Sequence, residues 1–203
     1  YYNPTTNEIC FPAGILQPPY FNPEADDAAN YGAIGVVIGH EMTHGFDDKG
    51  SLYDKNGNMS AWWQKTDREA FQKKADFYSS YFDTVDVLPG LKSNGKMTNG
   101  ENLADHGGLM VAMEALNIAM KEAPLADADG FTPMQRFFLS YAGVWAGNWT
   151  EQGLKYLQKN DVHSIGFIRV NEALKHIDEF YKAFDVKEGD GMYIAPEKRL
   201  KLW

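Results

Sequence analysis

Two histidines stand four residues apart in the stretch His40-Glu41-Met42-Thr43-His44, and a glutamate directly follows the first. On an α-helix four residues advance ~6 Å and return to nearly the same face, so both imidazoles would leave one side of the helix. Such a pair can bind one metal ion, and Glu41 can then reach a water molecule bound to that metal. Zinc lowers the pKa of its bound water toward neutrality, so a carboxylate can take the proton. The spacing therefore predicts metal-assisted hydrolysis with one zinc ion per chain, and it requires a third protein ligand.

Glu101 is the candidate third ligand. It begins the stretch Glu101-Asn102-Leu103-Ala104-Asp105, in which the two carboxylates lie four residues apart and share one helix face. One carboxylate would bind the metal while the other accepts a hydrogen bond from a ligand imidazole and fixes its tautomer. The alternative is a capping box, Thr98-Asn99-Gly100-Glu101, in which Glu101 only satisfies a backbone N–H. Because the two histidines need a third ligand, we favour metal binding.

The helix that would carry the histidine pair is expected to span Asp26 to Phe46. The run Ile34-Gly35-Val36-Val37-Ile38-Gly39 just before the pair is apolar, so the pair would lie at the end of a buried helix, where polar side chains need partners. The interior glycines Gly32, Gly35 and Gly39 weaken a helix locally but allow another element to approach closely. We therefore expect this helix to be central.

The composition is that of an ordinary globular chain. The 203 residues are 44% hydrophobic and 23% charged, and we expect a single domain over residues 1–203. The net charge of −9 and the lack of clustered Lys and Arg argue against nucleic-acid binding. A single cysteine, Cys10, excludes an intrachain disulfide. The longest apolar run, Tyr31 to Gly39, is far shorter than the ~20 residues that span a bilayer, so we expect no membrane contact from this segment.

Periodicity and capping signals predict a mainly α fold with a short N-terminal β-hairpin. The hairpin would pair Tyr1–Asn3 with Glu8–Phe11. Further helices are expected at 61–83 after a Ser60 cap, at 99–122, from Thr132-Pro133-Met134-Gln135 onward, at 151–158 and at 164–183, followed by an irregular tail at 186–203.

Four blocks of sequence resemble the catalytic domain of the neprilysin and endothelin-converting-enzyme family of zinc endopeptidases. They are Phe11-Pro12-Ala13-Gly14-Ile15-Leu16-Gln17-Pro18-Pro19, His40 to Asp48, Gly100 to Asp105, and Asp161-Val162-His163-Ser164. The closing Pro196-Glu197-Lys198 and Trp203 also fit. The resemblance runs from end to end and implies a thermolysin-like catalytic subdomain.

The resemblance implies a role for each polar residue of these blocks. The zinc ligands would be His40, His44 and Glu101, with Glu41 as the general base that activates water and Asp105 as the outer partner of His40. His163, oriented by Asp161, would stabilise the tetrahedral intermediate. Arg169 would hold a substrate backbone carbonyl and would itself be positioned by Asp47. Without the resemblance, His163 would equally be a helix N-terminal residue capped by Asp161 or Ser164, and Arg169 a surface charge.

The resemblance also implies an apolar specificity pocket. Its positions here are Ile15, Tyr20, Val37, Val144 and Trp145. Taken singly, all five would be ordinary core residues. Such a pocket predicts cleavage of oligopeptides on the amino side of a bulky hydrophobic residue.

The chain departs from the family pattern in several places. An Asn-Ala dipeptide would come just before Tyr1, and the family's large N-terminal lid domain is not in this sequence, so we expect that domain as a partner in a longer parent protein. Leu200 stands where the family has a cysteine, which suggests a bacterial member, and Ile165 and Phe167 replace a proline and an asparagine. Bacterial members are typically exported, so the expected location is extracytoplasmic.

A zinc-stabilised binding domain without catalysis is the alternative function. Its metal site would be closed by a fourth protein ligand instead of water. His106 is the nearest spare ligand, but its side chain should point away from the Asp105 face of the helix.

Overall fold

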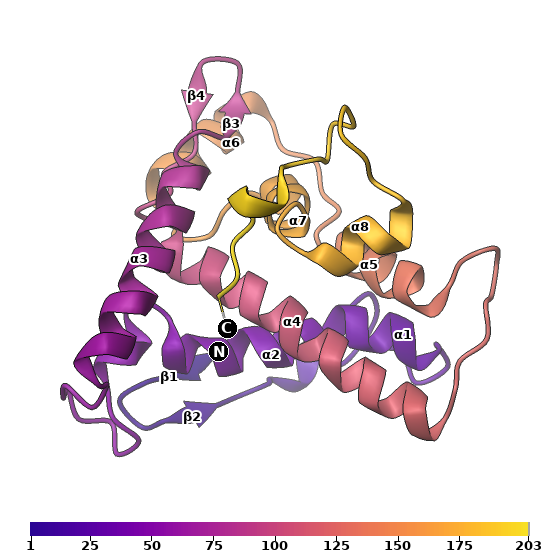
Figure 1. The fold of residues 1–203 in the computed structure, drawn as a ribbon, viewed down its shortest axis with the longest axis horizontal. Helices are drawn as coiled ribbons and strands as arrows, with labels where there is room; N and C mark the ends of the chain where they lie inside the picture. Colours follow the sequence, from indigo (N-terminus) through magenta and orange to yellow (C-terminus); the bar gives the residue numbers. More distant parts are fainter. Residues whose placement is uncertain (203) are drawn as a thin grey trace.

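A long helix, α4 (Asn99–Glu122), crosses the middle of the molecule, and the shorter helix α2 (Val36–Thr43) lies against it (Figure 1). The computed structural model describes residues 1–202, so the expected match at Trp203 lies outside the described part. The fold is mainly helical with two small antiparallel strand pairs, which confirms the predicted fold class.

The other helices surround this central pair, as Figure 1 shows. They are α1 (Asp27–Asn30), α3 (Lys65–Phe82), α5 (Pro133–Val144), α6 (Glu151–Asn160), α7 (Gly166–Leu174) and α8 (Asp178–Phe184). The strands are β1 (Tyr2–Asn3) with β2 (Glu8–Ile9), and β3 (Asp86–Leu88) with β4 (Leu91–Lys92). In the predicted N-terminal hairpin Tyr2 pairs with Ile9 and Asn3 with Glu8.

The expected helix from Asp26 to Phe46 forms as a continuous helical segment, but with changes of pitch along it. Asp26 caps α1 by accepting a hydrogen bond from the Ala29 amide. A π-helical turn, Tyr31–Gly35, separates α1 from α2, and a 3₁₀ turn, His44–Phe46, follows α2. Such π-turns shift the side chains that follow them around the helix axis and occur frequently near functional sites.

Glycines let α2 lie directly on α4. A Cβ atom added at Gly39 would lie 2.9 Å from the Gly108 carbonyl oxygen, and one at Gly108 would lie 2.7 Å from the backbone nitrogen of His40. A Cβ at Gly32 would similarly meet the Phe137 carbonyl of α5 at 2.1 Å. The predicted close approach is therefore confirmed at Gly32 and Gly39, whereas Gly35 contacts only its own segment.

Two apolar clusters hold the helices together. The larger one joins α2, α4, α5, α7 and α8 around residues such as Leu116, Phe138 and Ile177. The second packs α3 against α4 and α7, and it includes Leu200 and Leu202 from the tail. The tail is irregular as predicted, yet its leucines are buried in this second cluster.

Two expected helix boundaries are wrong, and one strand pair was not expected. Helix α3 begins at Lys65 after Gln64, not after Ser60, because residues 61–64 are irregular and pack the Trp62 and Trp63 rings against Phe46 and Phe71. The β3–β4 hairpin was not predicted, and its turn places Gly90 at a φ of +80° that favours glycine. The expected helix at 164–183 is broken at Ile177, whose burial in the larger cluster requires the chain to turn before α8.

Candidate metal centre

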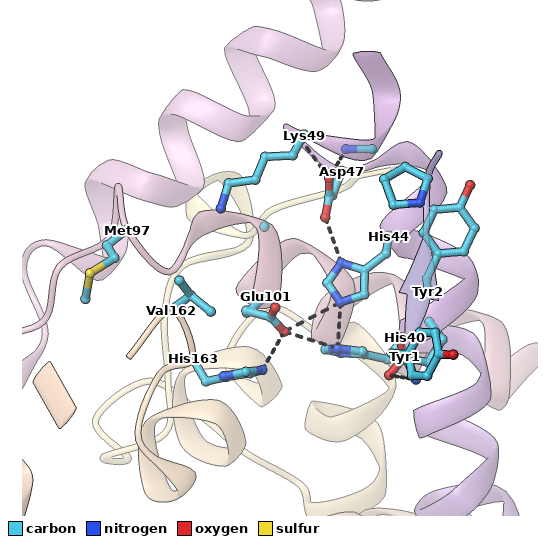
Figure 2. Close-up of a pocket in the computed structure, with 14 residues that line it drawn as sticks. Tyr1, Tyr2, His40, His44, Asp47, Lys49, Met97, Glu101, Val162 and His163 are labelled. Atoms are coloured by element: carbon cyan, nitrogen blue, oxygen red, sulfur yellow. Dashed lines mark hydrogen bonds and ion pairs between the residues drawn. The ribbon is translucent and has the colours of Figure 1, made fainter. Parts of the chain in front are cut away.

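The side chains of His40, His44 and Glu101 converge on one point at the end of α2 (Figure 2). The two Nε2 atoms are 3.0 Å apart. Glu101 Oε2 lies 3.2 Å from His40 Nε2 and 3.6 Å from His44 Nε2. The first turn of α4 supplies the carboxylate, and the last turn of α2 and the following 3₁₀ turn supply the two imidazoles.

These separations fit a tetrahedral metal site. Zinc binds imidazole nitrogen and carboxylate oxygen at ~2.0–2.2 Å, which places neighbouring ligand atoms of a tetrahedron about 3.3–3.6 Å apart. The observed values of 3.0, 3.2 and 3.6 Å bracket this distance. Glu101 Oε2 is also buried and accepts no hydrogen bond from the described residues.

The other ring nitrogen of each histidine is bonded to a carboxylate, which fixes the tautomers. His40 Nδ1–H donates to Asp105 Oδ1 at 2.8 Å, as the sequence predicted. His44 Nδ1–H donates to Asp47 Oδ2 at 2.7 Å, and Asp47 Oδ1 is held by the Lys49 and Gly50 amides. In the neutral imidazoles both Nε2 lone pairs therefore face the Glu101 oxygen, an arrangement that a cation between them stabilises.

The electrostatic field at this point favours positive charge. Burial lowers the pKa of His44, but its bond to Asp47 and the nearby Glu101 outweigh burial and raise that pKa to about 10. Burial also opposes protonation of His40, yet Asp105 and Glu101 raise its pKa. The pKa of Glu101 shifts the other way, because the two imidazoles outweigh burial and lower it. Two histidines among three carboxylates thus form a strongly cation-attracting site.

The capping-box interpretation of Glu101 is wrong. Thr98 makes no side-chain cap at the start of α4. Its hydroxyl donates to the Asn94 carbonyl and accepts from Asn102 Nδ2. The Glu101 carboxylate instead turns toward the two histidines.

Asp105 links the metal centre to Arg169. Its side chain is buried, and its two oxygens accept bonds of 2.7 Å from Arg169 Nε and Nη2 as well as the bond from His40. Burial raises the pKa of Asp105, but Arg169 and His40 outweigh it and lower that pKa. The expectation that Asp47 positions Arg169 is therefore wrong, because Asp47 serves His44 and Arg169 pairs with Asp105.

His163 lies opposite the histidine pair, in the loop between α6 and α7. Its Nε2 is 3.3 Å from Glu101 Oε2. Asp161 Oδ1 accepts from both the His163 Nδ1, at 2.8 Å, and the His163 backbone amide, at 2.9 Å. Asp161 therefore orients the ring and also caps the loop, and the ring remains about half exposed, facing the metal centre (Figure 2).

The five residues predicted for the apolar pocket line one cavity of ≈180 Å³. They share it with polar groups of the site, namely His40, Glu41, Asp105, His163 and Arg169. Of the five, Val144 is buried and the other four are partly buried, and Trp145 also packs against the larger apolar cluster, so a pocket wall and a core position are not exclusive. The Arg169 guanidinium lies 3.9 Å over the Trp145 ring.

His106 lies away from the metal centre. Its side chain is buried against the Tyr78 ring, with the centroids 5.8 Å apart, and burial lowers its pKa to about 4. It is absent from the residues that line the ≈340 Å³ cavity around the metal centre. That cavity includes residues that sequence reasoning did not single out: Tyr2, Lys49, Met97 and Val162.

Comparisons with known proteins identify the family. The model of peptidase family M13 matches residues 1–200, so the chain belongs to this family. The chain is 40% identical over 203 residues to a neutral endopeptidase of Lactococcus lactis, and 41% identical over 209 residues to neprilysin-1 of Caenorhabditis elegans. These relatives confirm the resemblance seen in the sequence.

Solved structures agree with the family assignment. The crystal structure of the zinc metalloprotease Zmp1 of Mycobacterium tuberculosis, in complex with an inhibitor, matches all of this chain at a TM-score of 0.96 and 40% identity. PepO of Lactobacillus matches at a TM-score of 0.89.

The chain spans about a third of the length of these relatives. It covers 31% of the Lactococcus protein, 28% of neprilysin-1 and 32% of the Zmp1 chain. Among residues 1–202, no helix combines the length and the apolarity needed to cross a membrane.

Proposed function

We propose that this chain is the catalytic part of a zinc-dependent endopeptidase that hydrolyses oligopeptides. The observation that carries the proposal is the convergence of two imidazole nitrogens and one carboxylate oxygen at 3.0–3.6 Å, with each imidazole held through Nδ1 by a further carboxylate. His40, His44 and Glu101 would hold the zinc ion. Bound there, zinc would polarise a peptide carbonyl and acidify a water molecule.

Glu41 is the proposed general base. It follows the first ligand, its side chain is largely buried, and it lines both the metal cavity and the apolar pocket. In this position its carboxylate takes a proton from the attacking water as the new C–O bond forms. It then delivers that proton to the amine nitrogen as the C–N bond breaks, so the protons balance over the cycle.

His163 and Arg169 are proposed to act on the peptide itself. The bond between His163 Nδ1 and Asp161 directs His163 Nε2 toward the oxygen that becomes negative in the tetrahedral intermediate. Arg169 uses Nε and Nη2 on Asp105, which leaves Nη1 to donate to a substrate carbonyl. Asp105 thereby orients both a metal ligand and a substrate-binding residue.

The apolar pocket is proposed to select the residue on the carboxyl side of the cleaved bond. Ile15, Tyr20, Val37, Val144 and Trp145 enclose ≈180 Å³ beside Glu41 and Arg169, a space suited to one bulky apolar side chain. Cleavage would therefore occur on the amino side of such a residue.

Two further proposals concern the parent protein. The relatives are about three times longer, which is consistent with an additional lid domain that covers the site as a partner of this chain. By similarity to exported family members, the site would work outside the cytoplasm.

The test combines metal analysis with cleavage of quenched fluorescent peptides. We expect about one zinc per chain, and Glu41→Gln should lower kcat by ~10²–10⁴-fold while zinc remains bound. Glu114→Gln, an exposed glutamate on α4, is the matched control and should retain activity. Full turnover by Glu41→Gln would contradict the mechanism, and bound zinc without hydrolysis by the unmodified chain would instead favour a zinc-stabilised binding domain.

A further inference from the structure

A second cavity, of ≈510 Å³, lies next to the apolar pocket. It is formed by the end of α5, the coil that follows it, α6 and the start of α7. The side chains that characterise it are Trp145, Trp149, Leu157, His163, Ile165 and Arg169. Neither the zinc ligands nor Glu41 contribute to it, so it is distinct from the metal cavity.

The two cavities share a wall. Val144, Trp145, His163 and Arg169 line both of them. The core of this wall is the Arg169 guanidinium stacked 3.9 Å over the Trp145 ring, which is held in place by the two bonds from Arg169 to Asp105. The stacked Arg169 and Trp145 side chains therefore separate the second cavity from the apolar pocket.

The backbone fixes this wall tightly. A Cβ atom added at Gly166 would lie only 2.7 Å from the Trp145 carbonyl oxygen. The first turn of α7 thus presses directly on the residue that separates the cavities. A wall held by main-chain contact and a buried ion pair is rigid, as a specificity element must be.

The side chains that line the second cavity are largely apolar. Trp149 is 58% exposed, although it is a residue type that usually gains by burial, while Leu157 is half-buried and Ile165 fully buried. Rigid aromatic side chains of this kind provide large contact areas at low entropic cost in recognition sites. Asp161 and Ser164 supply the polar edge.

We propose that this cavity is a second specificity pocket, which binds an aromatic or large aliphatic side chain of the same peptide that fills the first pocket. The proposal rests on the endopeptidase function and names a further determinant of its substrates. An extended peptide advances ~3.3 Å per residue. A side chain one or two residues along from the first pocket can therefore cross the shared wall and contact Trp149 and Leu157.

Peptides that differ at one position test this assignment. Each peptide would keep one phenylalanine for the first pocket and carry phenylalanine or glycine at each of the two residues on either side. We expect one position at which phenylalanine raises kcat/KM by about 10-fold or more over glycine. Trp149→Ala should reduce that preference to within about twofold, and Leu157→Ser should reduce it in the same direction.

Tyr156→Ala is the matched control. Tyr156 is an exposed aromatic residue on α6, adjacent in sequence to Leu157, and it does not line the cavity. Its replacement should leave the preference intact. The proposal is overturned if the unmodified chain has no such preference, or if the preference survives in Trp149→Ala.

A binding measurement separates this proposal from the endopeptidase function. Fluorescence anisotropy with labelled peptides and zinc-loaded Glu41→Gln protein reports affinity without turnover. Suppose that the unmodified chain cleaves no peptide, but Glu41→Gln still binds the phenylalanine peptide more tightly than the glycine peptide. If Trp149→Ala then removes this difference in affinity, the second pocket is supported and the hydrolytic mechanism is contradicted. Equal affinities in the Glu41→Gln protein would overturn the pocket.

Discussion

The chain contains two pairs of neighbouring histidines with opposite surroundings. His40 and His44 face carboxylates on both sides of their rings, and their pKa values are raised. His106 and His176 pack against the Tyr78 ring in the second apolar cluster, where burial lowers their pKa values to about 4 and about 3.

The difference lies in the surroundings of the rings, which suit His40 and His44, and not the second pair, to binding a cation. Around His40 and His44, every Nδ1 is bonded and every Nε2 points to a shared position. Around the second pair, His106 Nδ1 and His176 Nε2 have no hydrogen-bond partner among residues 1–202, and the neighbours are aromatic rings. Burial without a bonded carboxylate therefore favours the neutral form of these two imidazoles.

Removing the third ligand should have the largest effect. Among residues 1–202, Glu101 supplies the one carboxylate oxygen recorded near both Nε2 atoms, and Glu101→Ala removes it, so we expect zinc affinity to fall by more than about 100-fold. Competition with a chromophoric chelator measures it. Glu114→Ala on the same helix and His106→Gln in the second pair should both leave zinc affinity unchanged, and unchanged affinity in Glu101→Ala would remove Glu101 from the metal site.

Acid should lower the free energy of unfolding of the chain through the second pair, His106 and His176. Because the folded-state pKa values of His106 and His176 lie below the ~6.5 of the unfolded chain, their stabilising contribution is complete above pH 6.5 and is lost as the pH falls toward 4 and 3. At pH 5 we expect each histidine to cost about 1–2 kcal/mol of unfolding free energy. Urea titrations at pH 7.5 and pH 5 measure the loss.

His176→Asn is the variant for this experiment. His176 Nδ1 accepts a hydrogen bond from the Leu200 amide at 2.8 Å, and an asparagine oxygen can replace that acceptor without titrating. The loss of stability between the two pH values should shrink by about 1–2 kcal/mol in this variant. An unaltered pH dependence would show that His176 is not held neutral.

Weakening the outer support of the first pair should have a smaller effect. In Asp47→Asn the Oδ1 acceptor for the Lys49 and Gly50 amides is kept, but the oxygen that accepts from His44 Nδ1 becomes an amide donor. Zinc affinity should fall by about 10-fold or more, the lower end of the range for outer partners of metal ligands. Affinity equal to that of the unmodified chain would show that Asp47 does not support the ligand.

The smallest expected change is at Tyr78, between the second pair. Its hydroxyl is fully buried and has no hydrogen-bond partner among the described residues. Tyr78→Phe removes an unsatisfied group at almost constant shape, so stability should stay constant or rise by up to ~1 kcal/mol. A clear loss in a urea titration would indicate that the hydroxyl is satisfied in solution.

Local signals in the sequence were sufficient for most helices. The capping box at Thr132 and Gln135 is present as expected, and the α4 boundaries match the prediction. The errors occur where tertiary packing decides, since the Trp62 and Trp63 rings pack against Phe46 and Phe71 before α3 begins, and Ile177 is buried in the core. Such contacts join residues that are distant in sequence, so no local pattern contains them.

The site residues also separate into contacts that are local in sequence, which could be predicted, and contacts between distant residues, which could not. The spacing within His40–His44 and within Glu101–Asp105 predicted two groups that the structure brings together, and the Asp161–His163 pairing is equally local. The bond from His44 to Asp47 spans only three residues and could have been predicted from that spacing. The partner of Arg169 could not, because it lies 64 residues away on another helix.

The main-chain contact between Gly39 and Gly108 has a consequence for how this chain can diverge. Backbone atoms at these two glycines set how closely α2 and α4 approach, and the Thr43 side chain packs against Gly107 beside them. A methyl group at Gly39 or Gly108 would meet the backbone of the facing helix at 2.9 Å or less, so the two helices would have to move apart. The gap between the imidazoles of α2 and the carboxylate of α4 would then widen, so we expect neither glycine to accept a larger residue without a change in the site.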